Sequence, residues 1–455
     1  MQNNTIAAIS TANGPGGIGV IRISGEDAFD IADKIFKGIN NKSICSMNGY
    51  TAAYGSVYDG NEKLDEVVVT VFKAPHSYTG ENVVEISCHG GMYITKQVLR
   101  AVIDNGALPA QAGEFTQRAF LNGKMDLSEA EAVMDIISAK GKIQARAALA
   151  CHDGKISKEI FKVNKILVDC AAHLSAWADY PEEDIPQVDN KNLGDNLNNA
   201  KLIVENLLKN YDAGMTLKRG IDTIIVGKPN VGKSTLMNQL TGYEKSIVTN
   251  IPGTTRDIIE ETVILGDVTL NLSDTAGLRD TDNVVEKIGV ERARKKIETC
   301  GLVLAVFDAT DNLNDEDVKL LKTISDVPAV AIINKTDQET IIDIDYIKSQ
   351  IDNIVYISAK NGDGINDLVK IVEKITGTSS FDPNAATLAT ERQRDCALRA
   401  LDAINEAINA LQIGITLDAI TVSIEDAVQN ILEITGERAS EVIVHSVFSK
   451  FCVGK

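Results

Sequence analysis

The sequence predicts a multidomain protein of the α+β and α/β classes, in which an α/β domain is inserted into a discontinuous helical domain. Short β-branched runs fill the first 120 residues, and long helical periods follow to about residue 219. Helical periods resume after Phe381, and strands alternate with helices in between. With 455 residues, of which 44% are hydrophobic, the chain is long enough for about three domains.

Residues 1–120 are expected to form an α+β domain. Its predicted strands are TIAAIST, GVIRIS, EVVVTVF and NVVEISC, which glycine, proline and asparagine separate. Gly14, Gly16 and Gly19 have the GxGxxG spacing of a dinucleotide-binding loop, but that loop must open a helix. Residues 20–24 read as a strand, so we expect no dinucleotide site here.

Residues 121–219 and 379–455 are expected to form one helical domain, because neither segment alone covers its apolar faces. Ser128 and Glu131 have the spacing of a capping box that starts a helix. The acidic stretch at 180–186 reads as a turn between two helices. In the second segment, one apolar helical face carries Leu401, Ile404, Ile408 and Leu411, and another helix is expected at about 418–434. Three consecutive domains are the alternative.

Composition excludes several classes of protein. A net charge of −19 argues against broad adhesion to nucleic acid or anionic membranes, although it leaves room for a local basic patch. The seven cysteines include no CxxC pair, which signals neither a zinc site nor a disulfide framework. No apolar run approaches the roughly 20 residues of a membrane helix, and the first arginine comes late, at Arg22. A cytoplasmic location is therefore the default expectation.

The sequence GKPNVGKS at residues 227–234 predicts a phosphate-binding loop. It follows an apolar run at 221–226 and precedes TLMNQL, which is the order strand, glycine-rich loop, helix. Backbone N–H groups of such a loop wrap a pyrophosphate, and the helix N-terminus adds a positive dipole. Lys233 is expected to bridge the β- and γ-phosphates, and Ser234 to ligate Mg²⁺.

Strands alternate with helices over residues 220–378, which are expected to form a Ras-like P-loop domain. Further motifs in this domain select the nucleotide. In NKTD at 334–337, the Asp337 carboxylate can accept hydrogen bonds from N1–H and the 2-amino group of guanine, whereas adenine offers no donor there. SAK at 358–360 would present a backbone N–H to the guanine O6. In DTAG at 274–277, Asp274 can reach Mg²⁺ through water, and the Gly277 N–H can touch the γ-phosphate. Together these motifs predict GTP.

The stretch IPGTTRD at 251–257 has the position of a first switch loop. Thr255 would complete the Mg²⁺ shell while the γ-phosphate is present, which makes the loop a two-state element. Ras-like enzymes carry a glutamine directly after DxxG that orients the attacking water, but this chain has Leu278. Another group must therefore position the water. The expected GTP contacts are Asn230, Val231, Gly232, Lys233, Ser234, Thr235, Thr249, Asn250, Ile251, Pro252, Gly253, Thr254, Thr255, Asp274, Thr275, Ala276, Gly277, Asn334, Lys335, Asp337, Ser358, Ala359 and Lys360.

The combination of GKPNVGKS, GTTRD, DTAGLR, NKTD, SAK and the ending FCVGK resembles the MnmE (TrmE) family of tRNA-modification GTPases. The resemblance covers the whole chain, since GGIGVIRISG, SYTGENVVEISCHGG and GEFTQRAFLNGKMDLSEAEAV also match that family. The family ends on a Cys-x-Gly-Lys tail, usually with isoleucine or leucine where this chain has Val453.

The resemblance implies a potassium ion in the place that an arginine finger takes elsewhere, held by Asn230, Thr249, Ile251 and Thr254. It also implies that Glu286 positions the attacking water in place of the missing glutamine.

The resemblance further implies a 5-formyltetrahydrofolate-type ligand on the N-terminal domain, which forms a constitutive homodimer. The matching residues are Arg22, Glu85, Lys124 and Lys455, whose charges suit the glutamate tail and the aminopyrimidine edge of the pterin. Cys452 matches the family cysteine, and both a redox or catalytic thiol and an inert thiol remain open.

The function expected from the resemblance is GTP hydrolysis that depends on Mg²⁺ and K⁺. With an MnmG (GidA)-type FAD protein in a heterotetramer, it would serve the 5-carboxymethylaminomethyl modification at carbon 5 of the wobble uridine of certain tRNAs. Ammonium and glycine both remain open as amine donor.

Two alternative functions fit the sequence less well. A ribosome-assembly GTPase of the Era or EngA type would carry a second P-loop or a KH-like domain with a GxxG loop, and the sequence has neither. A folate-dependent aminomethyl transferase without a switch would leave the GTP motifs unused.

Overall fold

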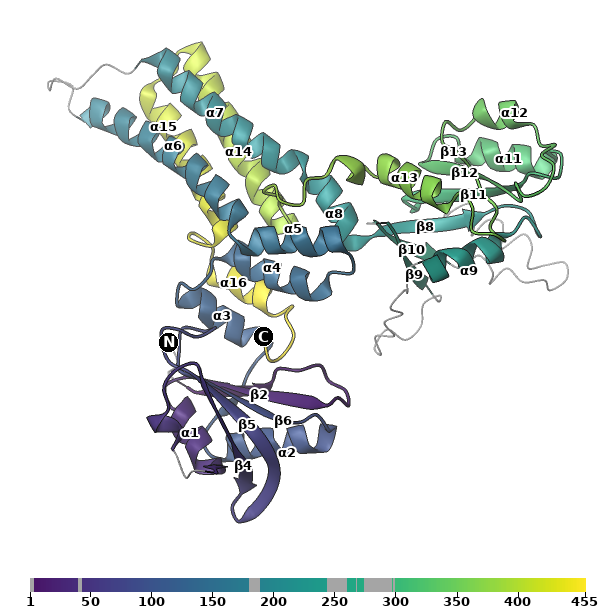
Figure 1. The fold of residues 1–455 in the computed structure, drawn as a ribbon. Coiled ribbons are helices and arrows are strands. Elements are labelled where there is room, and N and C mark those ends of the chain that lie inside the picture. Colours follow the sequence, from purple (N-terminus) through teal and green to yellow (C-terminus); the bar gives the residue numbers. More distant parts are fainter. Residues whose placement is uncertain are drawn as a thin grey trace, which may run out of the picture. The chain divides into compact units, whose positions relative to one another are not determined.

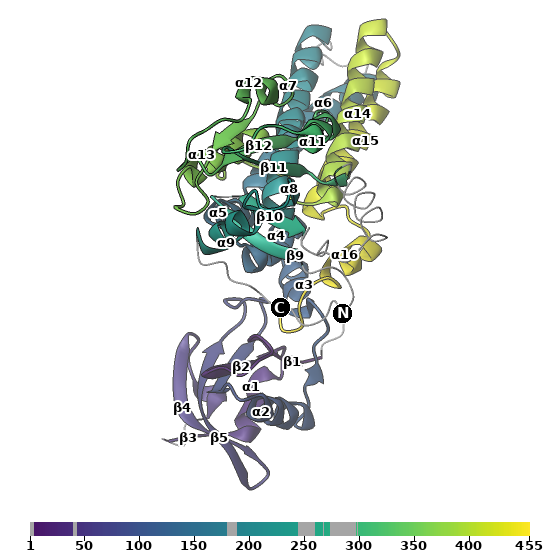
Figure 2. The same cartoon turned by 90° about the vertical axis from the view of Figure 1, so that its right-hand side faces the viewer.

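The computed structural model divides into two compact units (Figures 1 and 2). It describes residues 4–39, 43–179, 189–243, 260–266, 268–273, 297 and 299–455. Unit 1 comprises residues 1–134, 157–201 and 396–455, and unit 2 comprises residues 135–156 and 202–395. The four-segment division expected from the sequence stays a prediction.

Unit 1 contains a seven-stranded sheet in the order β3-β4-β5-β6-β2-β1-β7. Its strands are β1 Ile6–Ile9, β2 Ile18–Ser24, β3 Phe36–Gly38, β4 Thr51–Asp59, β5 Glu62–Phe72, β6 Val83–His89 and β7 Leu108–Pro109. Neighbouring strands are antiparallel except β1 and β7, which are parallel. Helices α1 (Ala28–Ile35) and α2 (Met92–Asp104) share one apolar core with the sheet. The strands expected in this region are confirmed, and β2 directly after the glycine-rich stretch confirms that no dinucleotide-binding helix starts there.

The other helices that lie wholly or partly in unit 1 come from both ends of the chain. They are α3 Glu114–Leu121, α4 Leu127–Ser138, α6 Lys155–Asp179, α7 Asn190–Lys209, α14 Glu391–Ile413, α15 Leu417–Thr435 and α16 Glu441–Phe448, with a short 3₁₀ turn η1 at Ile44–Ser46. Figures 1 and 2 show α6, α7, α14 and α15 side by side. In this bundle Arg399 of α14 forms an ion pair with Glu433 of α15. A helical domain built from both segments, as the sequence predicted, is confirmed.

The predicted capping box at Ser128 and Glu131 is wrong by two residues. The Asp126 carboxylate accepts a hydrogen bond from the Glu129 backbone N–H at 2.9 Å, and the Glu129 carboxylate accepts one from the Asp126 N–H at 2.9 Å. Aspartate caps a helix as well as serine does, so the spacing alone fitted both registers. Ser128 lies inside the first turn of α4. The acidic stretch at 180–186 lies outside the described residues.

Unit 2 contains a six-stranded sheet in the order β13-β12-β11-β8-β10-β9. Its strands are β8 Ile221–Val226, β9 Glu260–Leu265, β10 Val268–Ser273, β11 Leu302–Asp308, β12 Ala329–Asn334 and β13 Ile354–Tyr356. All pairs are parallel except β9 with β10. The central strands β11 and β12 are buried along almost their whole length, as expected for a sheet covered on both faces.

Helices cover both faces of this sheet. Helices α9 (Lys233–Tyr243) and α13 (Ile365–Ile375) share one core with it, and α11 (Asp315–Ile324) and α12 (Ile344–Lys348) share the other. Unit 2 also holds α5 (Lys142–His152), α8 (Tyr211–Arg219) and the 3₁₀ turn η3 (Thr378–Ser380). The chain passes from β8 to β9 and β10 on one side of β8 and then to β11 on its other side, so a crevice is expected at the carboxyl end of β8. Within the described ranges, no helix combines the length and the apolar character needed to cross a membrane.

Candidate nucleotide site and a second polar site

The glycine-rich loop follows β8, and its glycines are required by close contacts. Gly227 has φ 145° and Gly232 has φ 101°, which are conformations that favour glycine. A Cβ atom would lie 2.3 Å from the Val306 carbonyl oxygen at Gly227, and 2.1 Å from Asn334 Nδ2 at Gly232. Asn230, at φ 64°, also adopts the left-handed conformation. The loop is therefore a tight turn that brings its backbone to the N-terminus of α9, as a phosphate cradle requires.

Lys233, the first residue of α9, is directed back into the loop. Its Nζ donates to the carbonyl oxygens of Gly227 at 2.7 Å and Lys228 at 2.5 Å. Burial lowers the pKa of Lys233, because the neighbouring carbonyls compensate the charge less well than water does. A phosphate anion at this place would restore full compensation. Ser234 and Thr235 are exposed in the first turn of α9, where a metal or phosphate can reach them.

Asn334 connects three of the predicted motifs. Its Nδ2 donates to the Val231 carbonyl oxygen at 2.8 Å, and its Oδ1 accepts from the Ala359 N–H at 2.9 Å. The residue is only 3% exposed. The phosphate loop, the NKTD loop and the SAK loop are thus fastened to one side chain, and the structure brings them together as the sequence predicted.

The residues expected to bind the base lie beside this connection. Ser358 Oγ donates to Asp337 Oδ1 at 2.8 Å, which fixes one oxygen of an otherwise exposed carboxylate. Lys335 lies 2.5 Å from Asp308 Oδ2 at the end of β11. Burial raises the pKa of Asp308, but hydrogen bonds from Lys335 and Thr310 outweigh it and hold the pKa below its usual value. Sequence reasoning missed Asp308, although its position at a strand end was a usable signal. Lys360 is exposed.

Part of the predicted site lies outside the described residues. These positions are Thr249, Asn250, Ile251, Pro252, Gly253, Thr254, Thr255, Asp274, Thr275, Ala276, Gly277 and Glu286. The described residues include one expected Mg²⁺ ligand, Ser234, and one expected K⁺ ligand, Asn230.

A second polar site lies on the sheet of unit 1, where Arg22 of β2 is opposite Glu85 of β6. Arg22 Nη2 and Nε lie 2.8 and 2.9 Å from Glu85 Oε1. The guanidinium is 5.3 Å from the ring centroid of Tyr78 and 5.7 Å from that of Phe115. Arg22 Nη1 is buried and has no hydrogen-bond partner among the described residues. A buried donor of this kind fits a ligand that carries an anionic or acceptor oxygen.

The C-terminal tail completes this site. The Gly113 N–H donates to the Cys452 carbonyl oxygen at 3.3 Å, and Ser10 Oγ donates to the Gly454 carbonyl oxygen at 3.1 Å. Burial lowers the pKa of Lys455, Arg22 lowers it further, and Glu85 opposes both. Lys455 therefore lies within electrostatic range of the Arg22–Glu85 pair, where two cations face one carboxylate.

The remaining predicted residues of this site are placed less centrally. Lys124 Nζ donates to the Pro75 carbonyl oxygen at 3.1 Å. Among the residues that the structure describes, no hydrogen bond or ion pair joins Lys124 to the Arg22–Glu85 pair. Cys452 is exposed. The sequence did not indicate Tyr78 and Phe115, because isolated aromatic residues carry no signal for a cation contact.

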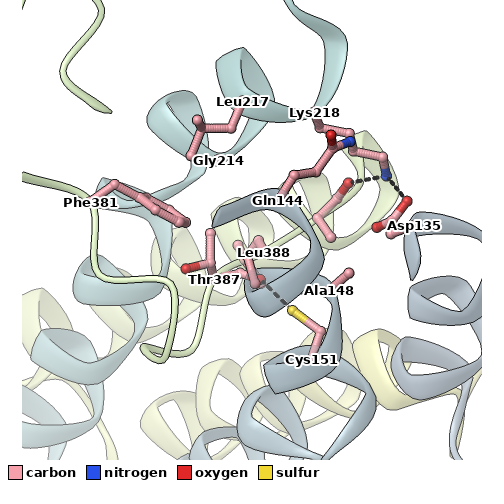
Figure 3. A pocket seen from close by; sticks show the side chains of 12 residues that line it. Asp135, Gln144, Ala148, Cys151, Gly214, Leu217, Lys218, Phe381, Thr387 and Leu388 are labelled. Atoms are coloured by element: carbon pink, nitrogen blue, oxygen red, sulfur yellow. Dashed lines mark hydrogen bonds and ion pairs between the residues drawn. The ribbon is translucent and has the colours of Figure 1, made fainter. Parts of the chain in front are cut away.

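Unit 2 holds a further cavity of about 40 Å³ between α5, α8 and residues 381–389 (Figure 3). Lys218 Nζ lies 2.7 Å from Asp135 Oδ1 and donates to the Ala389 carbonyl oxygen at 2.9 Å. Cys151 Sγ donates to the Thr387 carbonyl oxygen at 3.4 Å. Burial raises the pKa of Cys151 to about 11, so it is an unreactive thiol at neutral pH. The sequence did not predict this cavity.

Comparisons with known proteins cover the whole chain. Residues 5–124 match the family model of the GTP-binding protein TrmE N-terminus, and residues 127–452 match that of the MnmE helical domain. Part of the chain is similar to the crystal structure of the G domain of the T. maritima FeoB iron transporter, with 27% identity and a TM-score of 0.27. That similarity covers 34% of this chain and 98% of the FeoB chain.

Three curated relatives carry the name tRNA modification GTPase MnmE. The protein of Clostridioides difficile (strain 630) is 39% identical over 456 residues, which covers 100% of this chain and 99% of the relative. That of Acetivibrio thermocellus (strain ATCC 27405) is 39% identical over 459 residues and covers 100% of both. That of Bacillus subtilis (strain 168) is 38% identical over 458 residues, with 99% of this chain and 100% of the relative covered. With this similarity over its full length, the chain belongs to the MnmE (TrmE) family of tRNA modification GTPases.

Proposed function

We propose that this protein hydrolyses GTP to GDP and phosphate and thereby takes part in the 5-carboxymethylaminomethyl-type modification at carbon 5 of the wobble uridine of certain tRNAs. The observation that carries the proposal is the full-length similarity to relatives named tRNA modification GTPase MnmE. The nucleotide site supports it, because Asn334 holds the phosphate, base and SAK loops together by hydrogen bonds.

The described residues divide the work of GTP binding. The backbone of the 227–234 loop and Lys233 bind the phosphates, and a compact glycine turn suits them because it leaves no room for a side chain. Asp337 accepts from the guanine N1–H and 2-amino groups, and its hydrogen bond from Ser358 holds it in place. The Ala359 N–H is already bonded to Asn334, so the base contact from this loop falls to the neighbouring Lys360 N–H.

Two metal ions belong to the proposal. Ser234, with Thr255, would hold Mg²⁺, and Asn230, with Thr249, Ile251 and Thr254, would hold K⁺. Exposed Ser234 in the first turn of α9 and left-handed Asn230 at the loop both fit these roles. When bound, the ions supply positive charge to the phosphates during hydrolysis. Glu286 would hold the attacking water and take up its proton.

The Arg22–Glu85 site in unit 1 would bind a 5-formyltetrahydrofolate-type folate, which supplies a one-carbon group when bound. The unpartnered Arg22 Nη1 and the excess of cations over carboxylates fit the anionic glutamate tail. Lys455 would add a second cation, Glu85 would accept from the aminopyrimidine edge, and Lys124 would contact the ligand from the side of Pro75.

The proposed partners follow the family. The protein would act in the cytoplasm as a homodimer that forms a heterotetramer with an MnmG (GidA)-type FAD protein, and the substrate would be tRNA. The redox chemistry would belong to the partner. The Era or EngA alternative is not favoured, because the relatives cover the N-terminal and helical regions as well as the P-loop region.

Two measurements test the proposal. Purified protein should hydrolyse GTP much faster in KCl than in NaCl at equal ionic strength, because Na⁺ is too small for the proposed oxygen ligands; equal rates would refute the potassium assignment. Mass spectrometry of tRNA nucleosides from cells that lack the gene should show loss of the modified wobble uridine. An unchanged nucleoside profile would refute the role in tRNA modification.

A further inference from the structure

The second residue of the phosphate loop, Lys228, is attached to a neighbouring helix instead of pointing into solvent. Its Nζ lies 2.6 Å from Asp317 Oδ2 in α11, and 3.8 Å from Asp311 Oδ2 in the preceding loop. The side chains of Lys228 and Asp317 are 16% and 3% exposed. A phosphate cradle needs its glycines, its lysine and its helix, but it does not need this ion pair.

Asp317 takes part in the helix cap at the start of α11. Asn314 caps this helix, and its Oδ1 accepts from the N–H groups of Glu316 at 3.0 Å and Asp317 at 3.1 Å. In return, Asp317 Oδ2 accepts from the Asn314 N–H at 3.1 Å. The same carboxylate oxygen therefore receives the helix cap and the ammonium of Lys228, so the phosphate loop is fixed to the first turn of α11.

The backbone of Lys228 is in contact with the phosphate-binding lysine. The Lys228 carbonyl oxygen accepts from Lys233 Nζ at 2.5 Å, and the adjacent Gly227 carbonyl oxygen accepts at 2.7 Å. A continuous chain of contacts thus runs from Asp317 through the side chain and the carbonyl of Lys228 to Lys233. Loss of either charge would leave its partner poorly compensated and would release the entrance of the loop.

We propose that Asp317 is a positioning residue for GTP binding, which acts through Lys228 to hold residues 227–228 where Lys233 can engage the phosphates. The inference rests on the proposed GTP site and adds to it a residue outside the nucleotide motifs. Its role is in ground-state binding, because the Lys228–Asp317 pair is already formed in the protein alone.

Four single variants of the full chain test this role. Asp317→Asn keeps an oxygen that can accept from the Asn314 N–H but removes the charge, and Lys228→Met removes the other charge. Lys228→Arg keeps a cation. Asn314→Ala weakens the same helix cap without touching the ion pair, so it is the matched control for a purely structural role. Dissociation constants for a fluorescent GTP analogue, KM and kcat for GTP, and thermal unfolding midpoints are measured for each.

The expected result is a roughly tenfold weaker binding of the analogue by Asp317→Asn and by Lys228→Met, in KM as well as in the dissociation constant, with kcat changed less than about twofold. The double variant should bind no more weakly than either single one, because both remove the same interaction. Lys228→Arg should bind within about twofold of the wild type. Asn314→Ala should lower the unfolding midpoint yet leave analogue binding unchanged.

Different outcomes refute different claims. If the wild type binds the analogue and Asp317→Asn binds equally well, the inference is wrong and the proposed GTP site stands. Equal weakening by Asn314→Ala and Asp317→Asn also refutes it, since the effect would then come from helix capping. A wild type that binds no guanine nucleotide would refute the proposed function and this inference with it.

Discussion

At the scale of single residues, the nucleotide site depends on how closely two loops approach. Gly232 lies so near Asn334 that an added Cβ atom would be 2.1 Å from Nδ2. That amide also carries the hydrogen bonds to Val231 and Ala359. The absence of a side chain at Gly232 therefore has two effects. It lets Asn334 connect the phosphate loop to the base loops, and it leaves room for the phosphate itself.

Replacement of Gly232 by alanine should disrupt the Asn334 connection and the approach of the phosphate. At φ 101° the new side chain is strained by about 1–3 kcal/mol, and it displaces Asn334, so affinity for GTP should fall at least roughly tenfold. Gly242→Ala is the control: nothing lies within 4 Å of a Cβ there, and the change should stabilise α9 by about 0.5–1 kcal/mol. Titration with a fluorescent GTP analogue measures the effect; unchanged affinity of Gly232→Ala would contradict it.

Asp337→Asn should move the preference of the site from guanine toward xanthine. The amide can donate to the xanthine 2-oxo group but presents a donor to the guanine amino group, so GTP affinity should fall by roughly a hundredfold. Ser358→Ala removes only the hydrogen bond that orients Asp337 and should cost about 1 kcal/mol. Competition between GTP and xanthosine triphosphate measures both. Retention of GTP preference by Asp337→Asn would contradict the guanine assignment.

At the scale of elements, a partly buried ion pair links α8 to α4, and the same lysine contacts the segment that leaves the P-loop domain. Figure 3 shows Lys218 of α8 directed toward Asp135 of α4. Lys218 also contacts the Ala389 carbonyl oxygen, and its side chain is 29% exposed against 11% for Asp135. The Lys218 ammonium thus connects α8, which precedes β8, with α4 and with Ala389, which follows η3.

Lys218→Met should loosen this region. The substitution leaves the Asp135 carboxylate and the Ala389 carbonyl without their cation, at a cost of about 1–3 kcal/mol. The neighbouring Arg219→Met is the control, because Arg219 and Glu391 are 64% and 62% exposed and such pairs contribute about 0–1 kcal/mol. Hydrogen exchange should accelerate in residues 127–138 and 211–219 for Lys218→Met alone. Equal protection in both variants would show that the buried pair does not hold these helices.

Local patterns predicted the elements better than their connections. Buried β-branched runs such as β11 and β12 are recognisable, because a strand covered on both faces has a continuous apolar sequence. The start of α4 was placed two residues late, since Asp126 and Ser128 both suit a cap and only tertiary structure selects between them. The Lys228–Asp317 pair could not be predicted for a related reason. Two charged residues that are far apart in the sequence are interpreted as solvated surface residues, and only the fold shows that they meet and are buried.

At the scale of the whole chain, the two ends meet in unit 1. The tail pairs at Val453 with Ala112 and bonds through Gly454 to Ser10, which brings Lys455 toward the Arg22–Glu85 pair. Periodicity and spacing do not reveal a contact between residues separated by more than 400 positions, and only the family resemblance pointed to Lys455.

Gly454→Val should separate this tail from the sheet. At φ 95° a Cβ atom would lie 2.3 Å from the Ile9 carbonyl oxygen, so the last residues would have to move and Lys455 would move away from the Arg22–Glu85 pair. Affinity for 5-formyltetrahydrofolate, measured by calorimetry, should fall roughly tenfold, which is the loss of one charge-assisted contact, while GTP affinity stays unchanged. Val453→Ile is the matched control, because that side chain is 59% exposed and its enlargement meets little resistance. Folate binding by Gly454→Val at the wild-type level would mean that Lys455 does not contribute to the Arg22–Glu85 site, whereas a wild type without folate affinity would refute the ligand itself.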